Sequence, residues 1–511
     1  MSQSRHRKEA NCKRRIANRL RRRNWRDQPA PMFTASNIHY DLSGRDLGLI
    51  CGGIGAMHLL AKRTGLRDAI DANLRVLKRH LPYHESDHVL NIAYNILAGG
   101  ECLEDIELHR NDEAYLEALG ALTIPDPTTA GDFCRRLQVP DVEGLQDLIN
   151  RTRQGVWRQQ PECFFEEAIV DADGTLAPTS GECKEGMDIS YNGTWGYHPL
   201  LISLANTSEP LYLVNRSGSR PSQEGAAARF DQAIALCRAS GFRRILLRGD
   251  TAFSSSRYLD GWDGQEVRFI FGMDAMKPPV QKAKILPESR WTRLHRPLKY
   301  RVRTEPRTRP ERVKEQIVRE REFENICLRS EDVAWFPYRP GACQKAYRMV
   351  VVRKNLSVEK GENVLFDDVR YFFFITNDWD TPAEQIVFLA NDRCNQENLI
   401  EQLKNGVQAM RMPVDNLVSN WAYMVMASLA WSMKAWFALL LPEGGRWAEK
   451  YRVEKQTVLR MEFKRFLNTL MRVPVQIIRA GRRLVYRLLG WNPWQHVLLR
   501  GVDHLRSPLR C

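Results

Sequence analysis

At 511 residues the chain is longer than one hydrophobic core usually supports, and its 43% hydrophobic content is enough to fill two to four domains. The formal net charge of +15 indicates a polyanionic partner, and nucleic acid is the first expectation. The eleven cysteines include no C-x-x-C pair, which argues against a zinc ribbon or a disulfide framework and favours a reducing compartment.

The N-terminal part is basic and then helical in pattern. Residues 1–30 hold eleven Lys or Arg, which predicts a basic disordered arm, either a solvated tail or an arm that lies on phosphates. Residues 31–160 read as a helical DNA-binding domain. Within it, Pro125–Leu137 predicts a helix capped by Thr128, with Arg135 and Arg136 either in a DNA groove or exposed on a packing helix.

From Glu167 onward, strand patterns alternate with a helix pattern, which predicts an α/β core beginning at residues 161–274. The expected strands are Ala168–Asp173, His198–Ala205, Pro210–Asn215, Arg244–Asp250 and Val267–Gly272, with a crossover helix over Glu224–Ser240.

The second half of the chain predicts three further regions. Residues 275–346 read as an inserted β-rich subdomain that is strongly basic at Lys299–Arg309, and residues 347–410 as the second part of the core. Residues 411–511 predict a helical C-terminal domain. The apolar stretch Asn416–Leu441 carries Lys434 and several polar side chains, so we expect a buried helix and not a membrane span.

Acidic residues at strand ends and on one helix are the candidate chemistry. Asp171 and Asp173 end one strand on the same face, because strand side chains alternate, and Asp250 ends another strand. A helix is expected to begin at Thr381-Pro382-Ala383-Glu384, and it or a closely following helix is expected to run through Glu397 to Lys404 and to stop at Asn405-Gly406. Carboxylates on such elements suit two divalent cations that act in phosphoryl transfer.

The same helix carries two cations near its acid. Arg393 precedes Glu397 by four residues and Lys404 follows it by seven, which places all three on one stripe, within roughly 40° of one another. An ordinary exposed ion pair is the alternative interpretation of Arg393 and Glu397.

Taken together, these motifs resemble a known family. D-x-T at Asp173, G-D at Asp250 and R-x3-E-x6-K at Arg393, Glu397 and Lys404 are similar to the DDE transposases of bacterial insertion sequences, specifically the cut-and-paste group with a Tyr-Arg-Glu-Lys signature. The chain departs from that signature at Ala390, where the family has a tyrosine that contacts DNA. This departure puts a phosphate or sugar contact in question and leaves the acids intact.

The resemblance implies an RNase H-like core, a mixed sheet interrupted by the basic β-rich insertion and flanked by helical N- and C-terminal domains. It implies Asp173 and Asp250 on adjacent strands and Glu397 on a helix beside them, together binding two Mg²⁺ or Mn²⁺ ions. The implied partners are double-stranded DNA, as element ends and target, and a second copy of the chain. The implied setting is the bacterial cytoplasm, at the nucleoid.

Several residues keep two interpretations. Arg393 and Lys404 are expected to hold phosphates, whereas Arg248 suits a strand-end ion pair as well as a DNA contact. Asp171 is a rival to Asp173 or an orienting residue behind it. In related transposases a tryptophan of the inserted domain stacks on a flipped base; Trp291 and Trp335 are the candidates, with a packing role as the alternative.

Three functions follow from these expectations. The first is a transposase that binds terminal inverted repeats and cuts and joins DNA. The second is an RNase H-like nuclease without strand transfer, and the third is a catalytically inactive, repurposed DNA-binding protein. The presence of all three acids disfavours the third.

Overall fold

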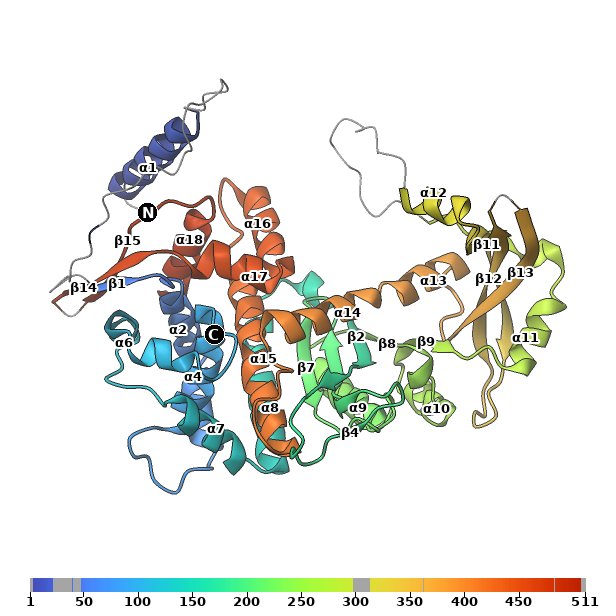
Figure 1. Ribbon diagram of the computed structural model, residues 1–511, viewed down its shortest axis with the longest axis horizontal. Coiled ribbons are helices and arrows are strands. Elements are labelled where there is room, and N and C mark those ends of the chain that lie inside the picture. The colour runs from blue at the N-terminus through green and yellow to red at the C-terminus, as the bar shows by residue number, and fades with distance from the viewer. Residues whose placement is uncertain are drawn as a thin grey trace.

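The computed structural model describes residues 3–21, 39, 47–296, 313–361, 363–481 and 483–506. Figure 1 shows three regions along the longest axis: a helical body, a central sheet and a β-arm at the far end. The candidate acids belong to the central sheet and to the helix that crosses it.

Nine strands form the principal sheet, in the order β10-β11-β12-β13-β9-β8-β2-β6-β7. Its centre is mixed, because β2 is antiparallel to β6 and parallel to β8, and β8 is parallel to β9. The predicted α/β core strands are therefore confirmed, at β2 (Glu167–Gly174), β6 (Leu200–Leu204), β7 (Glu209–Val214), β8 (Arg244–Gly249) and β9 (Arg268–Met273).

The β-arm continues this sheet. It consists mainly of three long antiparallel strands, β11 (Glu324–Tyr338), β12 (Tyr347–Lys360) and β13 (Asn363–Thr376), and short β10 (Thr292–Arg293) borders β11. Only the last four residues of β13 pair with β9, so the rest of the arm projects beyond the core (Figure 1). Residue 346, where we expected an inserted subdomain to end, lies between β11 and β12. The strand pairing therefore crosses that boundary.

The region at 275–346 also contains two helices, α11 (Lys277–Lys284) and α12 (Val313–Glu320), among its described residues. The expected basic stretch Lys299–Arg309 lies outside the described residues.

Helices cover the sheet and position the later acid. Crossover helix α9 (Ala226–Ala239) packs against β2, β6, β7 and β8. Helix α13 (Ala383–Asn391) places Ile386 and Val387 in an apolar cluster with Leu246 and Val350 of the sheet. Helix α14 (Cys394–Glu401) follows almost directly and contacts β2. The helix pair thus runs from the arm back toward the core (Figure 1).

Segments from both ends of the sequence form the helical body. Helix α15 (Leu417–Leu439) lies at its centre and packs against the earlier α2 (Ile54–Arg63), α4 (Glu85–Ala98), α7 (Pro127–Arg136) and α8 (Val139–Trp157), and against the later α16 (Ala448–Arg460). The smaller helices of the body are α3 (Leu66–Asn73), α5 (Ile106–Arg110), α6 (Glu113–Leu119), α17 (Phe463–Phe466) and α18 (Gln495–Arg506). The two expected helical domains therefore share one core.

Helix α15 is buried along nearly its whole length, as predicted for residues 416–441. Across the described parts of the chain, we find no helix that is both long enough and apolar enough to cross a bilayer.

Two expectations about the ends of the chain are corrected. Residues 3–21, expected to be disordered, form helix α1 (Gln3–Arg21). The basic segment at 478–488, expected within a helical domain, belongs to a hairpin of β14 (Val475–Ala480) and β15 (Arg483–Leu488), which pairs with β1 (Leu47–Leu49). In β15 the side chains alternate between exposed and partly buried, which is the period of a strand and not of a helix.

Helix α7 begins one residue earlier than its predicted cap. Asp126 is the N-cap, and its carboxylate accepts a hydrogen bond from the Thr129 N–H at 2.9 Å. Pro127 occupies the first helical position, where its fixed φ suits a helix start. Thr128 is therefore inside the helix.

Candidate active site

The first two acids stand at the same edge of the sheet. Asp173 lies near the end of β2, and Asp250 directly follows β8. These strands are adjacent and parallel, with Asp171 opposite Arg248, so the register brings Asp173 toward Asp250. Asp250 also caps the short 3-10 helix η2 (Thr251–Phe253) by accepting the Ala252 N–H at 2.9 Å. This bond fixes one carboxylate oxygen of Asp250.

Asp171, the rival acid, is committed to a buried ion pair. Its two oxygens accept from Arg248 Nε at 2.7 Å and Nη2 at 2.8 Å, and both side chains are at most 3% exposed. Arg248 Nη1 donates to the Leu389 carbonyl at 2.8 Å, which ties β2 and β8 to the end of α13. The DNA contact weighed for Arg248 is therefore wrong in this conformation, since the side chain is enclosed; the strand-end ion pair is what we find.

A second set of contacts fixes α14 over the sheet. Gln396 is buried between α14 and β6, where its side-chain carbonyl accepts from the Ser203 hydroxyl and its amide approaches the Leu201 carbonyl at 3.4 Å. Leu399 and Leu403 are buried in the main core. The helix that carries Glu397 is thereby held beside β2.

Arg393 connects two of the acids. Its Nη1 donates to Asp173 Oδ2 at 3.0 Å, and its Nη2 lies 4.0 Å from Glu397 Oε1. Asp173 is 14% exposed and Glu397 63% exposed, so Arg393 contacts one mostly buried acid and one that is open to solvent. The structure thus brings Arg393 and Glu397 to the strand-end acids, across more than two hundred residues of sequence.

Asp173 has a perturbed acidity. Burial raises the pKa of its carboxyl to about 6; the positive charge of Arg393 opposes this, and the negative charge of Asp250 adds to it. The raised pKa means that the ionised form of Asp173 is disfavoured by its surroundings. A cation bound beside it would therefore stabilise that form.

Lys404 does not continue a regular helical stripe with Arg393 and Glu397. The chain between α13 and α14 breaks near Arg393, and Lys404 belongs to a π-helical turn, η4 (Gln402–Gly406). Burial lowers the pKa of Lys404. Burial also lowers the pKa of His198, and the nearby charges of Arg216 and Lys404 lower it further. Lys404 is thus close enough to His198 for its positive charge to lower the pKa of that imidazole.

His198 packs against the D-x-T turn. A Cβ built on Gly174 would meet His198 Nε2 at 2.9 Å, which is closer than real Cβ contacts allow. The imidazole Nδ1 is held by the Arg220 carbonyl at 2.7 Å. Glycine between Asp173 and Thr175 is therefore explained by a close side-chain approach, a reason that the sequence alone does not reveal.

The donor set fits a hard divalent cation, since all three acids offer carboxylate oxygens. Within the described residues, however, no three His, Cys, Asp or Glu side chains are grouped tightly enough to hold a metal ion. The guanidinium of Arg393 contacts both Asp173 and Glu397, at 3.0 Å and 4.0 Å.

Residues 31–509 match the family model described as transposase DDE domain group 1. The chain belongs to this DDE transposase family. A search of curated proteins found no match. Among solved structures, the chain is similar to a piggyBac transposase in a synaptic complex with hairpin DNA, at 11% identity and a TM-score of 0.37, with 84% of this chain and 82% of the other covered.

The two candidate stacking tryptophans of this DDE family member are already in contact with arginines. The Arg353 guanidinium lies 4.4 Å from the centre of the Trp291 ring. Trp335 has Arg290 at 5.2 Å and Arg348 at 5.0 Å from its ring centre. Cation–π contacts of this kind stabilise the arm. A stacking role on DNA remains a prediction for both.

A basic groove in the helical body contains the two arginines predicted on α7. It is a hollow of about 610 Å³ lined by Val76, Lys78, Arg79, Arg135, Arg136 and Gln138. Arg135 is hydrogen-bonded to Asp132 at 2.9 Å and Asp415 at 3.0 Å, whereas Lys78, Arg79 and Arg136 form no ion pair with the described residues. Arg136 is therefore better placed than Arg135 to meet a phosphate.

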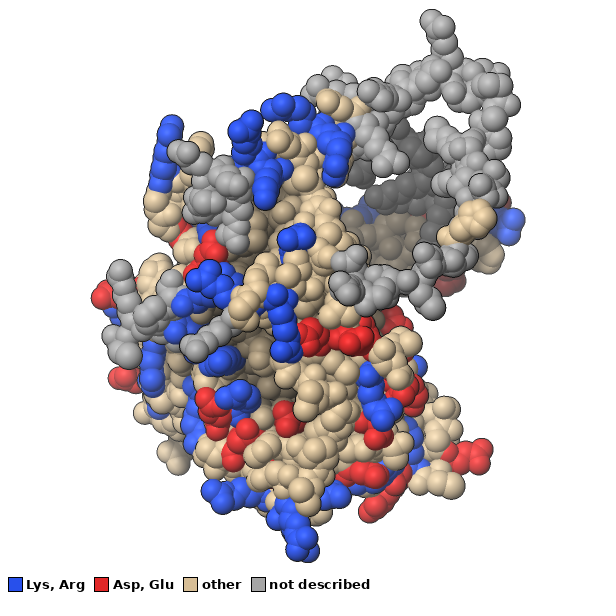
Figure 2. Space-filling model, turned by 90° about the vertical axis from the view of Figure 1, so that its left-hand side faces the viewer, with Lys and Arg blue, Asp and Glu red and all other residues tan. Residues whose placement is uncertain are grey.

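Another basic surface lies at the end of the helical body. Lys and Arg gather on the face shown in Figure 2, which is the side of the molecule where α1 and the β14–β15 hairpin lie. Exposed basic residues of these elements include Lys8, Lys13, Arg14, Arg15, Arg483 and Arg487. Such a surface suits a polyanion.

One further motif match is excluded by geometry. Residues His84 to His88 read H-E-S-D-H, the spacing of two zinc ligands and a general base on one helix. His84 is extended and precedes the first turn of α4, so the two histidines do not share a helical face. Glu85 accepts the backbone N–H groups of Val76 and Leu77, and His88 stacks on Phe133 with ring centres 4.3 Å apart.

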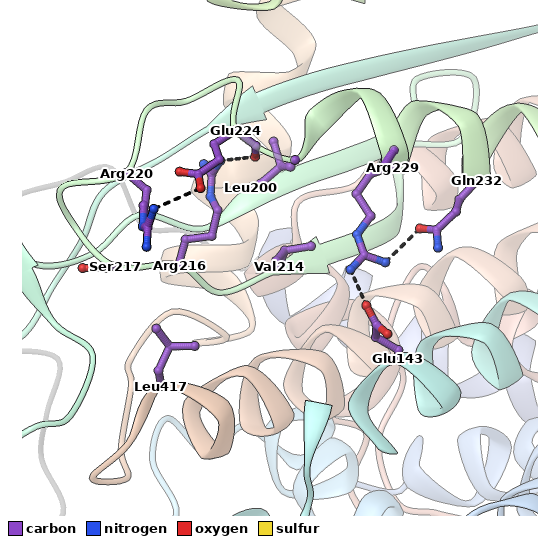
Figure 3. A pocket seen from close by; sticks show the side chains of 12 residues that line it. Glu143, Leu200, Val214, Arg216, Ser217, Arg220, Glu224, Arg229, Gln232 and Leu417 are labelled. Carbon is purple, nitrogen blue, oxygen red and sulfur yellow. Dashed lines mark hydrogen bonds and ion pairs between the residues drawn. The ribbon is translucent and has the colours of Figure 1, made fainter. Parts of the chain in front are cut away.

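A separate cavity of about 570 Å³ lies by the N-terminus of α9. Two of its arginines face acids: Arg220 is 3.1 Å from Glu224, and Arg229 is 2.5 Å from Glu143 (Figure 3). The third, Arg216, donates to the backbone carbonyls of His198, Pro221, Ser222 and Glu224. Because two of the arginines are paired with acids and Arg216 is bound by backbone carbonyls, we do not assign a phosphate to this cavity.

Proposed function

We propose that this chain is a DNA transposase that binds the terminal inverted repeats of an insertion sequence and catalyses metal-dependent strand cleavage and strand transfer. The observation that carries the proposal is the convergence at one sheet edge. Asp173 and Asp250 end adjacent parallel strands, and Arg393 links Asp173 to Glu397 on the covering helix.

The arrangement of the sheet supports the RNase H-like core that the sequence resemblance implies. Strand β2 has an antiparallel neighbour on one side and a parallel neighbour on the other, and the helix with the third acid packs beside it. In this proposal Asp173, Asp250 and Glu397 hold two Mg²⁺ or Mn²⁺ ions. When bound, such ions activate a water or a 3′-hydroxyl and stabilise the leaving oxygen.

The protein's own groups would position the reactants. The buried Asp171–Arg248 pair fixes the two strand ends relative to α13, and Lys404 offers a cation for a phosphate beside the scissile bond. The basic groove at Arg136 and the face shown in Figure 2 are candidate contacts for the longer DNA duplex. We propose that two copies act together, one on each element end.

The test uses labelled duplexes that carry the inverted repeats flanking the gene, incubated with the full chain and Mg²⁺ or Mn²⁺. Nicking of the ends followed by their joining to target DNA supports the transposase. Cleavage without joining indicates an RNase H-like nuclease, and binding without cleavage indicates a repurposed DNA-binding protein. A short target-site duplication beside genomic copies would separately support transposition.

A further inference from the structure

The side chain of Arg393 occupies an unusual position for a residue expected to hold DNA. One of its nitrogens is 3.0 Å from Asp173 and the other 4.0 Å from Glu397, and the side chain is only 19% exposed. Its backbone is fixed at the break before α14, where the Arg393 N–H approaches the Ala390 carbonyl at 3.3 Å and the Gln396 N–H donates to the Arg393 carbonyl at 2.8 Å. The guanidinium therefore faces the acids and not the solvent.

This guanidinium and a divalent cation would compete for the same carboxylate oxygens. A divalent cation held by Asp173 Oδ2 would share an atom that already accepts a hydrogen bond from Arg393. Two positive groups beside one carboxylate repel each other strongly where water is largely excluded. Among the described residues, no three His, Cys, Asp or Glu side chains are grouped closely enough to hold a metal ion, which agrees with this competition.

We infer that Arg393 is an exchangeable counter-ion of the acids: it neutralises Asp173 and Glu397 in the free protein, and a DNA phosphate draws it away so that divalent cations bind. This inference rests on the proposed function, because it requires that DNA and metal meet at this edge. It assigns Arg393 a positioning role that couples the two ligands.

The chemistry of arginine supports the exchange. A guanidinium makes bidentate hydrogen bonds to a phosphate as readily as to a carboxylate, so a phosphodiester at the open side of Glu397 is a suitable acceptor. The neighbouring pair shows the contrast. Arg248 binds both oxygens of Asp171 and is enclosed, so it has no route to an incoming phosphate. Arg393 makes one short contact and one long one, at the edge of the site.

Coupling of this kind is reciprocal. If DNA releases the acids from Arg393, DNA must tighten metal binding, and metal must tighten DNA binding by the same factor. The Arg393→Gln variant should lose this coupling, because it lacks the charge that moves between the two partners.

The first experiment measures Mn²⁺ binding to the full chain without DNA, by calorimetry and by the electron paramagnetic resonance signal of free Mn²⁺. We expect Arg393→Gln to bind Mn²⁺ at least about 5-fold more tightly than the unaltered chain, the lower end of typical coupling. Arg238→Gln is the matched control, because it removes an exposed arginine from the last turn of α9. It should leave the affinity for Mn²⁺ unchanged. Equal or weaker Mn²⁺ binding by Arg393→Gln would overturn the inference.

The second experiment repeats the titration with a saturating DNA duplex. The unaltered chain should then bind Mn²⁺ at least about 5-fold more tightly than without DNA, and Arg393→Gln should show no such gain. Arg393→Lys, which keeps a positive charge, should retain part of the gain and guards against a folding defect in the glutamine variant. Tight Mn²⁺ binding that is independent of DNA in every variant would overturn the inference and leave the proposed function standing. Failure of every protein to bind Mn²⁺, even with DNA, would overturn both.

Discussion

Two enclosed carboxylates of the sheet, one where it meets the helical body and one at the edge that holds the candidate site, have very different hydrogen-bond partners. Glu209, at the start of β7, is fully buried and accepts four hydrogen bonds: from Arg153 at 3.0 Å, Trp157 at 3.0 Å, Trp436 at 2.9 Å and Thr207 at 2.6 Å. These donors come from α8, α15 and the turn before β7. Glu209 thereby joins the helical body to the sheet.

Asp173 has fewer partners and a competing acid nearby. Its side-chain partner is Arg393, at one oxygen. Burial and the charge of Asp250 oppose its ionisation, whereas Arg393 and a backbone hydrogen bond from Gly174 favour it. A carboxylate with all its acceptor sites filled has no capacity left for a ligand, whereas one that is enclosed and under-satisfied gains from an added cation. The difference indicates which buried acid holds the fold together and which one serves the chemistry.

The largest expected effect concerns cleavage of labelled element ends. Asp173→Asn, Asp250→Asn and Glu397→Gln should each reduce the cleavage rate by at least about 1,000-fold, or roughly 4 kcal/mol of transition-state stabilisation, because each removes a proposed metal ligand. Binding of the ends should be nearly unchanged in a gel-shift titration.

Asp274→Asn is the control for this series, because Asp274 is an exposed acid that directly follows the next parallel strand, β9. Its cleavage rate should stay within about 2-fold of the unaltered chain, as expected of a surface substitution. Substantial cleavage by any one of the three acid variants would remove that residue from the site.

Substitution of the structural acid should instead cost stability. Glu209→Ala leaves the Arg153 guanidinium buried without its carboxylate and should lower the free energy of unfolding by about 3–5 kcal/mol. Urea unfolding followed by tryptophan fluorescence measures this. A loss below about 1 kcal/mol would break the contrast, since Glu209 would then be no more structural than a surface acid.

Asp173→Asn should have the opposite sign, because a raised pKa reports that the ionised form is disfavoured in the folded state. At pH 8 the acid is ionised in both states, so the neutral variant should be more stable than the metal-free chain by about 1–3 kcal/mol. The stability contributed by the protonated acid is complete below its unfolded pKa and is lost as the pH rises through about 6. The advantage of the variant should therefore shrink near pH 5. Unfolding curves at pH 5 and pH 8 in a chelating buffer test this; equal advantages at both would contradict it.

The smallest effect is expected at Lys404. Lys404→Ala should weaken DNA binding modestly and lower the slope of log affinity against log salt by about 1, the contribution of one phosphate contact. Fluorescence anisotropy over a salt series measures the slope. Arg136→Ala should lower the slope by a similar amount at the groove, and Arg135→Ala by less, since Asp132 and Asp415 already engage Arg135. An unchanged slope for Lys404→Ala would place it away from phosphates.

Part of the fold and site follows from local sequence. Apolar runs that end in acids predicted β2 and β8, and their alternation predicted that Asp171 and Asp173 share a face. The local pattern did not distinguish these two acids; the D-x-T resemblance favoured Asp173, and the fold commits Asp171 to Arg248. The basic segment at 478–488 falls in the region predicted to be a helical domain, because a six-residue strand such as β14, which pairs with β1 over four hundred residues earlier, leaves little local signal.

The sequence by itself determined which reactive and charged groups are present: the carboxylates, the arginines and the excess of basic residues. Tertiary structure alone decided how each was used. Enclosure filled every acceptor site of Glu209, paired Arg248 with Asp171, and left Asp173 with one shared guanidinium. The physical reason is that the cost of burying a charge depends on the partners that arrive from distant segments, and no local pattern specifies those partners.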